Sequence, residues 1–259
     1  ILLTNVWSSE LEKLTANAFL AQRISSINSI SALCETTGAD VREVARAIGS
    51  DRRIGSEFLD SGPGFGGSCF KKDILNLVYL SEYFGLPEVA DFWEGVVRLN
   101  NWHQNRISKL ITKKLFGTLS GKKISILGFA FKANTNDTRE SSAIQICKDL
   151  LEEGAILFIH DPKVEEKQIE KDLLNSFEKD DEEKRWFKEE NIDEVFFEAD
   201  AAVILTEWKQ YSKINWMKAS KVMRSPAWVF DTRSIVNPLN VTKSGLNLWR
   251  IGDGYNQFS

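Results

Sequence analysis

The chain has 259 residues, of which 42% are hydrophobic and 27% are charged, and its formal net charge is −4. This composition is typical of a globular protein and excludes an intrinsically disordered chain. The small negative charge gives no reason to expect binding to nucleic acid or to an anionic membrane surface, and no apolar run is long enough to cross a bilayer.

The cysteines and histidines are few. Cys34, Cys69 and Cys147 are widely spaced and odd in number, so we expect no disulfide framework and a reducing cytoplasm. His103 and His160 have no cysteine near them in the sequence, so we expect no metal site. A hydrolase that pairs a cysteine with a histidine stays open on these residues alone.

The first long element is a helix over residues 8–35. Ser8 or Ser9 followed by acidic residues predicts its start, and apolar residues keep a helical period almost to Gly38. A helix of this length suits a link between two domains or the core of a dimer. Lys13 and Asn17 are four residues apart and therefore lie on one helix face. A short helix over residues 39–48 follows, and we expect it to end at Gly49.

A glycine-rich stretch, GPGFGGSCFKKD, occupies residues 62–73. Its glycines allow sharp bends and a close approach to a ligand. Ser68 is predicted to cap the helix that follows, with Cys69 in its first turn and Asp73 on the same face. Free N–H groups at the helix start and the adjacent Lys71 and Lys72 favour the thiolate. The pattern suits a nucleophile presented to a substrate, and a buried structural cysteine after an ordinary turn is the alternative.

The second half of the sequence alternates strands with helices. A helix is predicted over residues 87–114 and another over 141–153, and the predicted strands cover residues 122–131, 155–162, 201–208 and 227–233. A final strand and a loose end are expected in residues 245–259. The pattern predicts a doubly wound parallel sheet whose ligand lies beyond the carboxyl ends of the strands. The first strand is not followed by a full G-x-G-x-x-G, so it predicts no dinucleotide site.

We place a domain boundary between a helical domain, residues 1–118, and an α/β domain, residues 119–259. Residues 163–194 include 20 charged residues, which indicates a solvated helix or an insertion, and we assign them no function.

Three segments carry a resemblance that covers nearly the whole chain in order. Residues 8–35, 62–73 and 121–143 resemble, respectively, the long central helix, the catalytic-cysteine segment and the start of the C-terminal domain of the UDP-glucose 6-dehydrogenase family. The wider family of UDP-sugar and GDP-mannose dehydrogenases shares them more loosely. The resemblance implies an α/β protein with a helical central dimerisation domain and a Rossmann-like UDP-binding domain.

The resemblance also implies roles for individual residues. Cys69 would be the nucleophile, Lys13 and Asn17 would stabilise the substrate oxygen, and Asp73 would orient a water or keep Lys13 charged. Arg139 would contact the cofactor NAD, and Arg53 would reach the sugar site of the partner subunit. The other residues that would bind substrate are Phe58, Leu59, Phe65, Gly66, Phe131, Lys132 and Arg233.

The implied activity is a two-step, NAD-dependent oxidation of UDP-glucose to UDP-glucuronate through a thiohemiacetal and a thioester, in a cytoplasmic homodimer joined by the long helix. Family members carry about two hundred residues before the position of Ile1, enough for one more domain, which holds most of the NAD site. We therefore expect a fragment that turns over poorly or not at all. The alternatives are a non-catalytic UDP-sugar-binding dimer, or a dehydrogenase for another nucleotide sugar such as UDP-N-acetylmannosamine or GDP-mannose.

Overall fold

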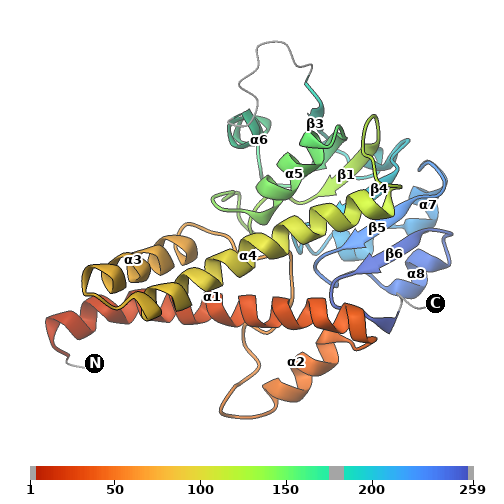
Figure 1. Cartoon of the computed structure of the whole chain (residues 1–259). Helices are drawn as coiled ribbons and strands as arrows, with labels where there is room; N and C mark the ends of the chain where they lie inside the picture. The colour runs from red at the N-terminus through yellow and green to blue at the C-terminus, as the bar shows by residue number, and fades with distance from the viewer. Residues whose placement is uncertain (1–3, 175–183, 256–259) are drawn as a thin grey trace.

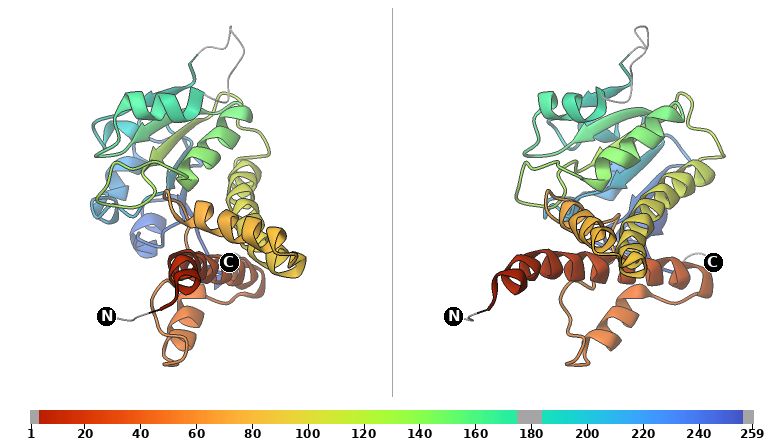
Figure 2. Two further views of the ribbon diagram at one scale, coloured as in Figure 1. Left: turned by 90° about the vertical axis from the view of Figure 1, so that its left-hand side faces the viewer. Right: turned by 60° about the vertical axis from the view of Figure 1, so that its left-hand side comes forward.

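The computed structural model describes residues 4–174 and 184–255, which form a helical layer and an α/β layer (Figure 1). The predicted fold class is confirmed: a long helix and its neighbours precede a parallel sheet with helices on both faces. Figure 2 shows α3 and α4 between α1 and the α/β layer, with α2 on the far side of α1. The helical layer consists of α1 (Val6–Thr37), α2 (Val41–Gly49), α3 (Phe70–Tyr83) and α4 (Pro87–Lys114).

Helix α1 is close to its prediction. It begins slightly earlier, because Asn5, and not Ser8 or Ser9, is the capping residue whose side chain accepts a hydrogen bond from a first-turn N–H. It ends where Gly38 adopts a left-handed φ of 77°, a conformation that glycine tolerates best. Helix α2 extends one residue beyond its prediction, with Ser50 as its C-cap.

Two small cores hold the helical layer together. Between α1, α3 and α4 lie buried apolar side chains, which are Ala18, Ala21, Phe65, Ile74, Leu77, Val96 and Val97. Between α1 and α2 lie Ile27, Cys34, Val41 and Leu59. Phe65 of the glycine-rich stretch and Leu59, which precedes that stretch, lie in different cores, and this restrains the path of the chain between them.

Within the described residues the sheet has six strands in the order β3-β2-β1-β4-β5-β6, and every adjacent pair is parallel. The strands are β1 (Lys123–Leu127), β2 (Ile156–His160), β3 (Trp186–Lys188), β4 (Ala201–Ile204), β5 (Trp228–Asp231) and β6 (Asn247–Arg250). The helices are α5 (Ser142–Glu152), α6 (Glu166–Leu174), α7 (Trp216–Ser220) and α8 (Pro238–Thr242), with short turns η1 (Glu194–Phe196) and η2 (Tyr211–Lys213). The order in which the chain adds strands therefore reverses between β1 and β4, and open parallel sheets bind ligands at such a point.

The last turns of α4 belong to the core of the sheet. Ile107, Ile111 and Leu115 pack in one cluster with residues of α5 and β1. The opposite face of the sheet is covered by a second cluster that includes Tyr211 and Trp216. Helix α4 thus joins the two layers, and the boundary after residue 118 stays a prediction.

The prediction of a loose end after the last strand was wrong for residues 251–254. Gly252 N donates to Glu35 Oε1 at 2.8 Å, Gly252 O accepts from Val41 N at 2.9 Å, and Gly254 N donates to Ala39 O at 2.8 Å. Residues 251–254 are therefore hydrogen-bonded to the end of α1 and the start of α2, although these helices lie more than two hundred positions earlier in the sequence.

The charged stretch contributes regular structure where it is described. Helix α6 and strand β3 both fall inside residues 163–194, and β3 was not predicted. Residues 175–183 of that stretch lie outside the described residues. None of the described helices combines the length and the apolarity that a membrane crossing requires.

Candidate functional site

The glycine loop, which we define as residues 62–68, lies between α4 and the segment that connects β1 to α5. A Cβ added at Gly66 would lie 2.4 Å from the carbonyl oxygen of Glu140. Gly67 has a φ of 87° and donates its N–H to Arg139 O at 2.8 Å, and its Cβ position faces the ring of Phe131 at 3.2 Å. The glycines therefore allow close contact with the chain's own backbone, which fixes the loop against the α/β layer.

Cys69 is exposed, whereas Cys34 and Cys147 are buried. The predicted cap was wrong: Cys69 itself is the N-cap residue of α3 with helical φ and ψ, and it makes no side-chain capping bond. Ser68 Oγ lies 3.6 Å from Cys69 Sγ. Cys69 O accepts from Asp73 N at 2.8 Å, so the thiol stands at the open end of the helix, where N–H groups favour an anion.

Asp73, Asn17 and Lys13 form one polar group, contributed by α3 and α1. Asn17 Nδ2 donates to Asp73 Oδ2 at 2.6 Å, and Lys13 Nζ lies 3.9 Å from the same oxygen. The Asp73 side chain is 5% exposed and that of Lys13 is 74% exposed. The ammonium therefore remains largely hydrated, and the buried carboxylate is held mainly by the amide.

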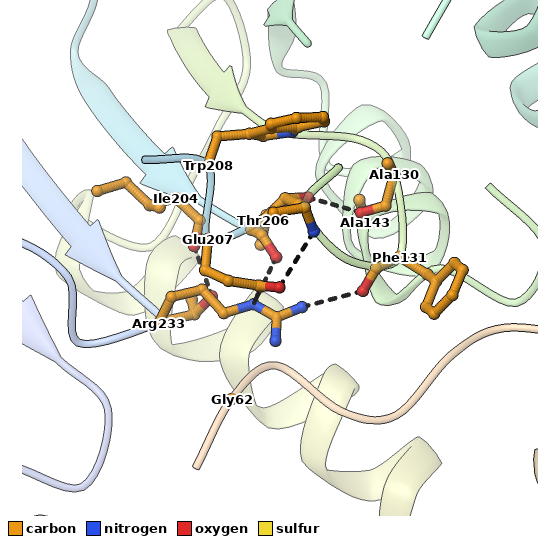
Figure 3. A network of polar contacts seen from close by, with 12 residues as sticks. Gly62, Ala130, Phe131, Ala143, Ile204, Thr206, Glu207, Trp208 and Arg233 are labelled. Carbon is orange, nitrogen blue, oxygen red and sulfur yellow. Dashed lines mark hydrogen bonds and ion pairs between the residues drawn. The ribbon is translucent and has the colours of Figure 1, made fainter. Parts of the chain in front are cut away.

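Arg233 follows β5 and is held at the carboxyl edge of the sheet (Figure 3). Its Nε donates to Leu205 O at 2.8 Å and lies 3.2 Å from Glu207 Oε2, and its Nη2 donates to Phe131 O at 3.4 Å. Burial lowers the pKa of Arg233 from its ordinary value, while Glu207 and Asp231 oppose that shift. Figure 3 shows the guanidinium facing the Gly62 segment. A guanidinium group held in a fixed orientation at the end of a strand is suited to bind a phosphate or a carboxylate.

A cavity of about 330 Å³ lies between the glycine loop and the carboxyl edge of the sheet. Six residues predicted to bind substrate line it: Phe58, Phe65, Gly66, Phe131, Lys132 and Arg233. Lys132 is exposed, and Phe58 has a φ of 59°, which is strained for a bulky residue and holds it at the rim. The structure thus brings together in one cavity residues from both layers.

A second cavity, of about 700 Å³, lies between α2 and the same edge of the sheet. It shares Asp60 and Arg233 with the first cavity. Leu59, also predicted to bind substrate, lines this second cavity, although its side chain is largely buried in the core beneath α2.

Arg53 and Arg139 line neither of these two cavities. Arg53 is highly exposed and is paired with Asp51, whose carboxylate raises the pKa of the arginine. Arg139 is paired with Asp137 at 2.7 Å. The pKa of Arg139 is raised, first by Asp137 and to a lesser extent by Cys69, which places its charge near the thiol.

The turn after β1 does not present free N–H groups to a ligand. Phe129 N and Ala130 N both donate to Asp161 Oδ2, at 2.8 and 3.0 Å. A buried carboxylate of the chain therefore occupies the position where a dinucleotide fold would bind a pyrophosphate. These residues do not fit a dinucleotide.

Neither histidine pairs with Cys69 among the described residues, which removes the hydrolase alternative. His103 Nε2 lies 2.8 Å from Gly62 O and its Nδ1 accepts from Arg106 Nε, while His160 Nδ1 lies 2.9 Å from the hydroxyl of Tyr211. Within the described residues no group of three His, Cys, Asp or Glu side chains is arranged to hold a metal ion.

Sequence reasoning missed the side chains that hold the glycine loop. Phe65 N donates to Asn100 Oδ1 at 2.9 Å, and Gly62 N donates to Asn28 Oδ1 at 2.9 Å. Both asparagines are buried and lie on long helices. A polar residue within an otherwise apolar helix face was the available signal.

Comparison with known proteins agrees with this architecture. A sequence model of the UDP-glucose/GDP-mannose dehydrogenase family, central domain, matches residues 7–102, and that of the family's UDP binding domain matches residues 125–238. The UDP-glucose 6-dehydrogenase of Drosophila melanogaster is 52% identical over 259 aligned residues, and that of Caenorhabditis elegans is 50% identical over 257. The chain belongs to the UDP-glucose/GDP-mannose dehydrogenase family.

The match is to part of each relative. The two alignments cover 98% and 99% of this chain but 54% and 53% of the relatives, so the chain spans about half the length of the curated relatives it matches. The solved structure of a UDP-glucose dehydrogenase from Pyrobaculum islandicum superposes with a TM-score of 0.78 at 29% identity, covering 95% of this chain and 51% of that one.

Proposed function

We propose that this chain supplies the UDP-sugar site and the reactive thiol of an NAD-dependent oxidoreductase of the UDP-glucose 6-dehydrogenase type. The observation that carries the proposal is one cavity that is bounded by the glycine loop and by the basic residues Lys132 and Arg233, with Cys69 directly after that loop. The names of the relatives support UDP-glucose as the substrate.

Lys132 and Arg233 would bind the diphosphate of the nucleotide sugar. Arg233 is already held in place by Leu205 O, Phe131 O and Glu207, so little side-chain freedom is lost when a ligand binds. Lys132 is exposed and adds a second charge at the rim. Phe58, Leu59, Phe65, Gly66 and Phe131 would shape the remaining contacts.

Cys69 would attack a sugar aldehyde. The C–S bond forms as the carbonyl π electrons move to oxygen, giving a thiohemiacetal alkoxide. Lys13 would stabilise that oxygen and donate its proton, and Asn17 has a second amide N–H beyond the one that Asp73 accepts. Asp73 would orient Asn17 and hold Lys13 near the reacting oxygen.

NAD would supply the hydride acceptor in such an oxidation. Since the turn after β1 does not fit a pyrophosphate, Arg139 is the contact to NAD that we propose within the described residues. The same observation favours a second candidate, a UDP-sugar-binding chain that does not turn over. Release of NADH from UDP-glucose and NAD, lost in Cys69→Ser, would separate the first candidate from the second.

Association through α1 is part of the proposal. Helix α1 exposes large apolar side chains along its length, which are Val6, Trp7, Leu11, Phe19 and Leu33. A homodimer would cover part of this surface and let Arg53 reach the partner's site. Light scattering of the chain should then give twice the monomer mass. The free thiols fit a reducing compartment such as the cytoplasm.

Calorimetric titration with UDP-glucose, and then with UDP, tests the proposal. We expect one site per chain, and affinity at least about tenfold weaker in Lys132→Ala, because a charge-assisted hydrogen bond is lost. Lys243→Ala, a lysine away from both cavities, is the matched control and should bind like the unmodified chain. Folded protein that binds neither ligand would contradict the proposal.

A further inference from the structure

Gly62, the first residue of the glycine loop, is held by buried side chains of two helices. Its N–H donates to Asn28 Oδ1 of α1 at 2.9 Å, and its carbonyl oxygen lies 2.8 Å from His103 Nε2 of α4. Asn28 and His103 are each 1% exposed. The backbone N–H and C=O of Gly62 are thus both bonded by side chains of the helical layer, and neither is bonded by the backbone of a helix or a strand.

The hydrogen bond from His103 to Gly62 requires one tautomer of the imidazole. Arg106 Nε donates to His103 Nδ1 at 3.2 Å, and arginine has no acceptor, so Nδ1 bears the lone pair and Nε2 bears the hydrogen. Arg106 is itself fixed by two bonds to Glu35, at 2.8 and 3.0 Å. Burial, together with Arg106, lowers the pKa of His103 to about 3, so the ring is neutral near pH 7.

Gly62 also sets the distance between the loop and the proposed phosphate site. A Cβ added at Gly62 would lie 3.1 Å from Arg233 Nη1, so the loop backbone packs directly against that guanidinium. We propose that His103 is a positioning residue, whose Nε2–H holds the Gly62 carbonyl and thereby fixes the glycine loop against Arg233. The consequence for UDP binding rests on the proposed function, whereas the hydrogen bond by which His103 positions the glycine loop does not depend on it.

The tautomer can be measured in the unmodified chain. Two-bond ¹H–¹⁵N correlation spectra distinguish protonated Nε2 from protonated Nδ1, and His103→Gln assigns the two histidines by removing one set of signals. We expect the Nε2–H tautomer at neutral pH. An Nδ1–H tautomer for His103 would overturn the proposal, since the ring could then not donate to Gly62.

Variants test what the bond does. In His103→Leu we expect the amides of Gly62 and of residues 64–67 to exchange with deuterium about tenfold faster or more, because a buried carbonyl loses its donor. His103→Gln should restore slow exchange, since its amide offers a donor for Gly62 and an acceptor for Arg106. Ser108→Ala is the matched control: Ser108 is buried on the same helix and donates to Asp149 at 2.6 Å, away from the loop.

Equal exchange in His103→Leu and Ser108→Ala, or fast exchange in His103→Gln, would overturn the proposal. UDP titration of the same variants adds a ligand readout, in which His103→Leu alone should bind about tenfold more weakly. If the unmodified chain binds no UDP, the proposed function fails, and the exchange rates still decide the role of His103.

Discussion

Cys69 differs from the other two cysteines in exposure and in surroundings. It lies at the start of α3 and is exposed, whereas Cys34 and Cys147 are buried. Burial raises the pKa of Cys147, and burial with the nearby Asp40 and Glu35 raises that of Cys34. Because the thiolate is the reactive form, the three sites should react at very different rates.

We expect iodoacetamide to add one carbamidomethyl group to the folded chain at Cys69 before it modifies the other two cysteines. Peptide mass spectrometry over a time course measures this. Cys69→Ser should remain largely unmodified until the chain is unfolded by urea, after which both remaining thiols should react. Modification of Cys34 or Cys147 at the rate of Cys69 in folded protein would contradict the burial described above.

His103 should make stability depend on pH. Its pKa is about 3 in the folded chain, against an ordinary value of 6.5, so the unfolded chain binds more protons between these values. The stabilisation is fully present above about pH 6.5 and is lost as the pH falls toward 3, by roughly 1.4 kcal/mol per pH unit. Arg106 is the charged group that faces the ring, and Glu35 faces Arg106.

Urea unfolding of the unmodified chain and of His103→Gln at pH 7.0, about 5.5 and about 4.5 measures this pH dependence. Comparing the two proteins isolates the contribution of His103, because all other groups titrate in both. We expect the unfolding free energy of the unmodified chain to decrease relative to that of His103→Gln as the pH falls. A difference that does not change with pH would show that His103 does not carry this dependence.

At the scale of elements, the glycine loop is defined by what it packs against. Gly66→Ala would place a Cβ 2.4 Å from Glu140 O, so either the loop or the β1–α5 connection must move. We expect a loss of about 1–3 kcal/mol in unfolding free energy, as for other overpacked sites. Gly95→Ala, in α4 and with only a flexible Arg98 atom at 3.8 Å, should instead be neutral or stabilising by up to about 1 kcal/mol. Urea unfolding measures both variants, and equal stability would contradict the assigned packing.

The elements that the sequence predicts best are those with a long apolar period. Helix α4 matches its predicted bounds, and β1, β2, β4 and β5 lie inside the predicted strands. Strand β3 escaped prediction because three residues within a charged stretch carry no period of their own. The ordered path of residues 251–254 was not predicted either, because Gly252 is hydrogen-bonded to Glu35, which is 217 positions away.

In the candidate site, too, contacts between residues far apart in the sequence could not be predicted. Spacing put Lys13 and Asn17 on one helix face, but only the resemblance joined them to Asp73, whose bond to Asn17 spans 56 positions. Cys69 was found from its local motif. His103 was not connected to the loop, because its contact with Gly62 depends on how two segments pack and leaves no local pattern.

At the scale of the whole molecule, one buried ion pair joins three parts of the chain. Arg106 of α4 bonds Glu35 of α1, and Glu35 Oε1 also accepts from Gly252 N after β6. The Glu35 side chain is 5% exposed and that of Arg106 is 15% exposed. Since α4 also contributes to the core of the sheet, the helical layer and the α/β layer should unfold in one transition.

Glu35→Ala tests this coupling. The variant leaves the buried guanidinium without its partner and Gly252 N without its acceptor, so we expect a loss of about 3–5 kcal/mol in unfolding free energy. The matched control is Glu94→Ala, which breaks an exposed pair with Arg98 on α4 and should cost at most about 0.5 kcal/mol. Urea unfolding followed by tryptophan fluorescence and by circular dichroism reports on both layers, which should melt together in the unmodified chain. Equal, small losses in the two variants would mean that the layers are held by apolar packing alone, and that the pair between Glu35 and Arg106 does not couple them.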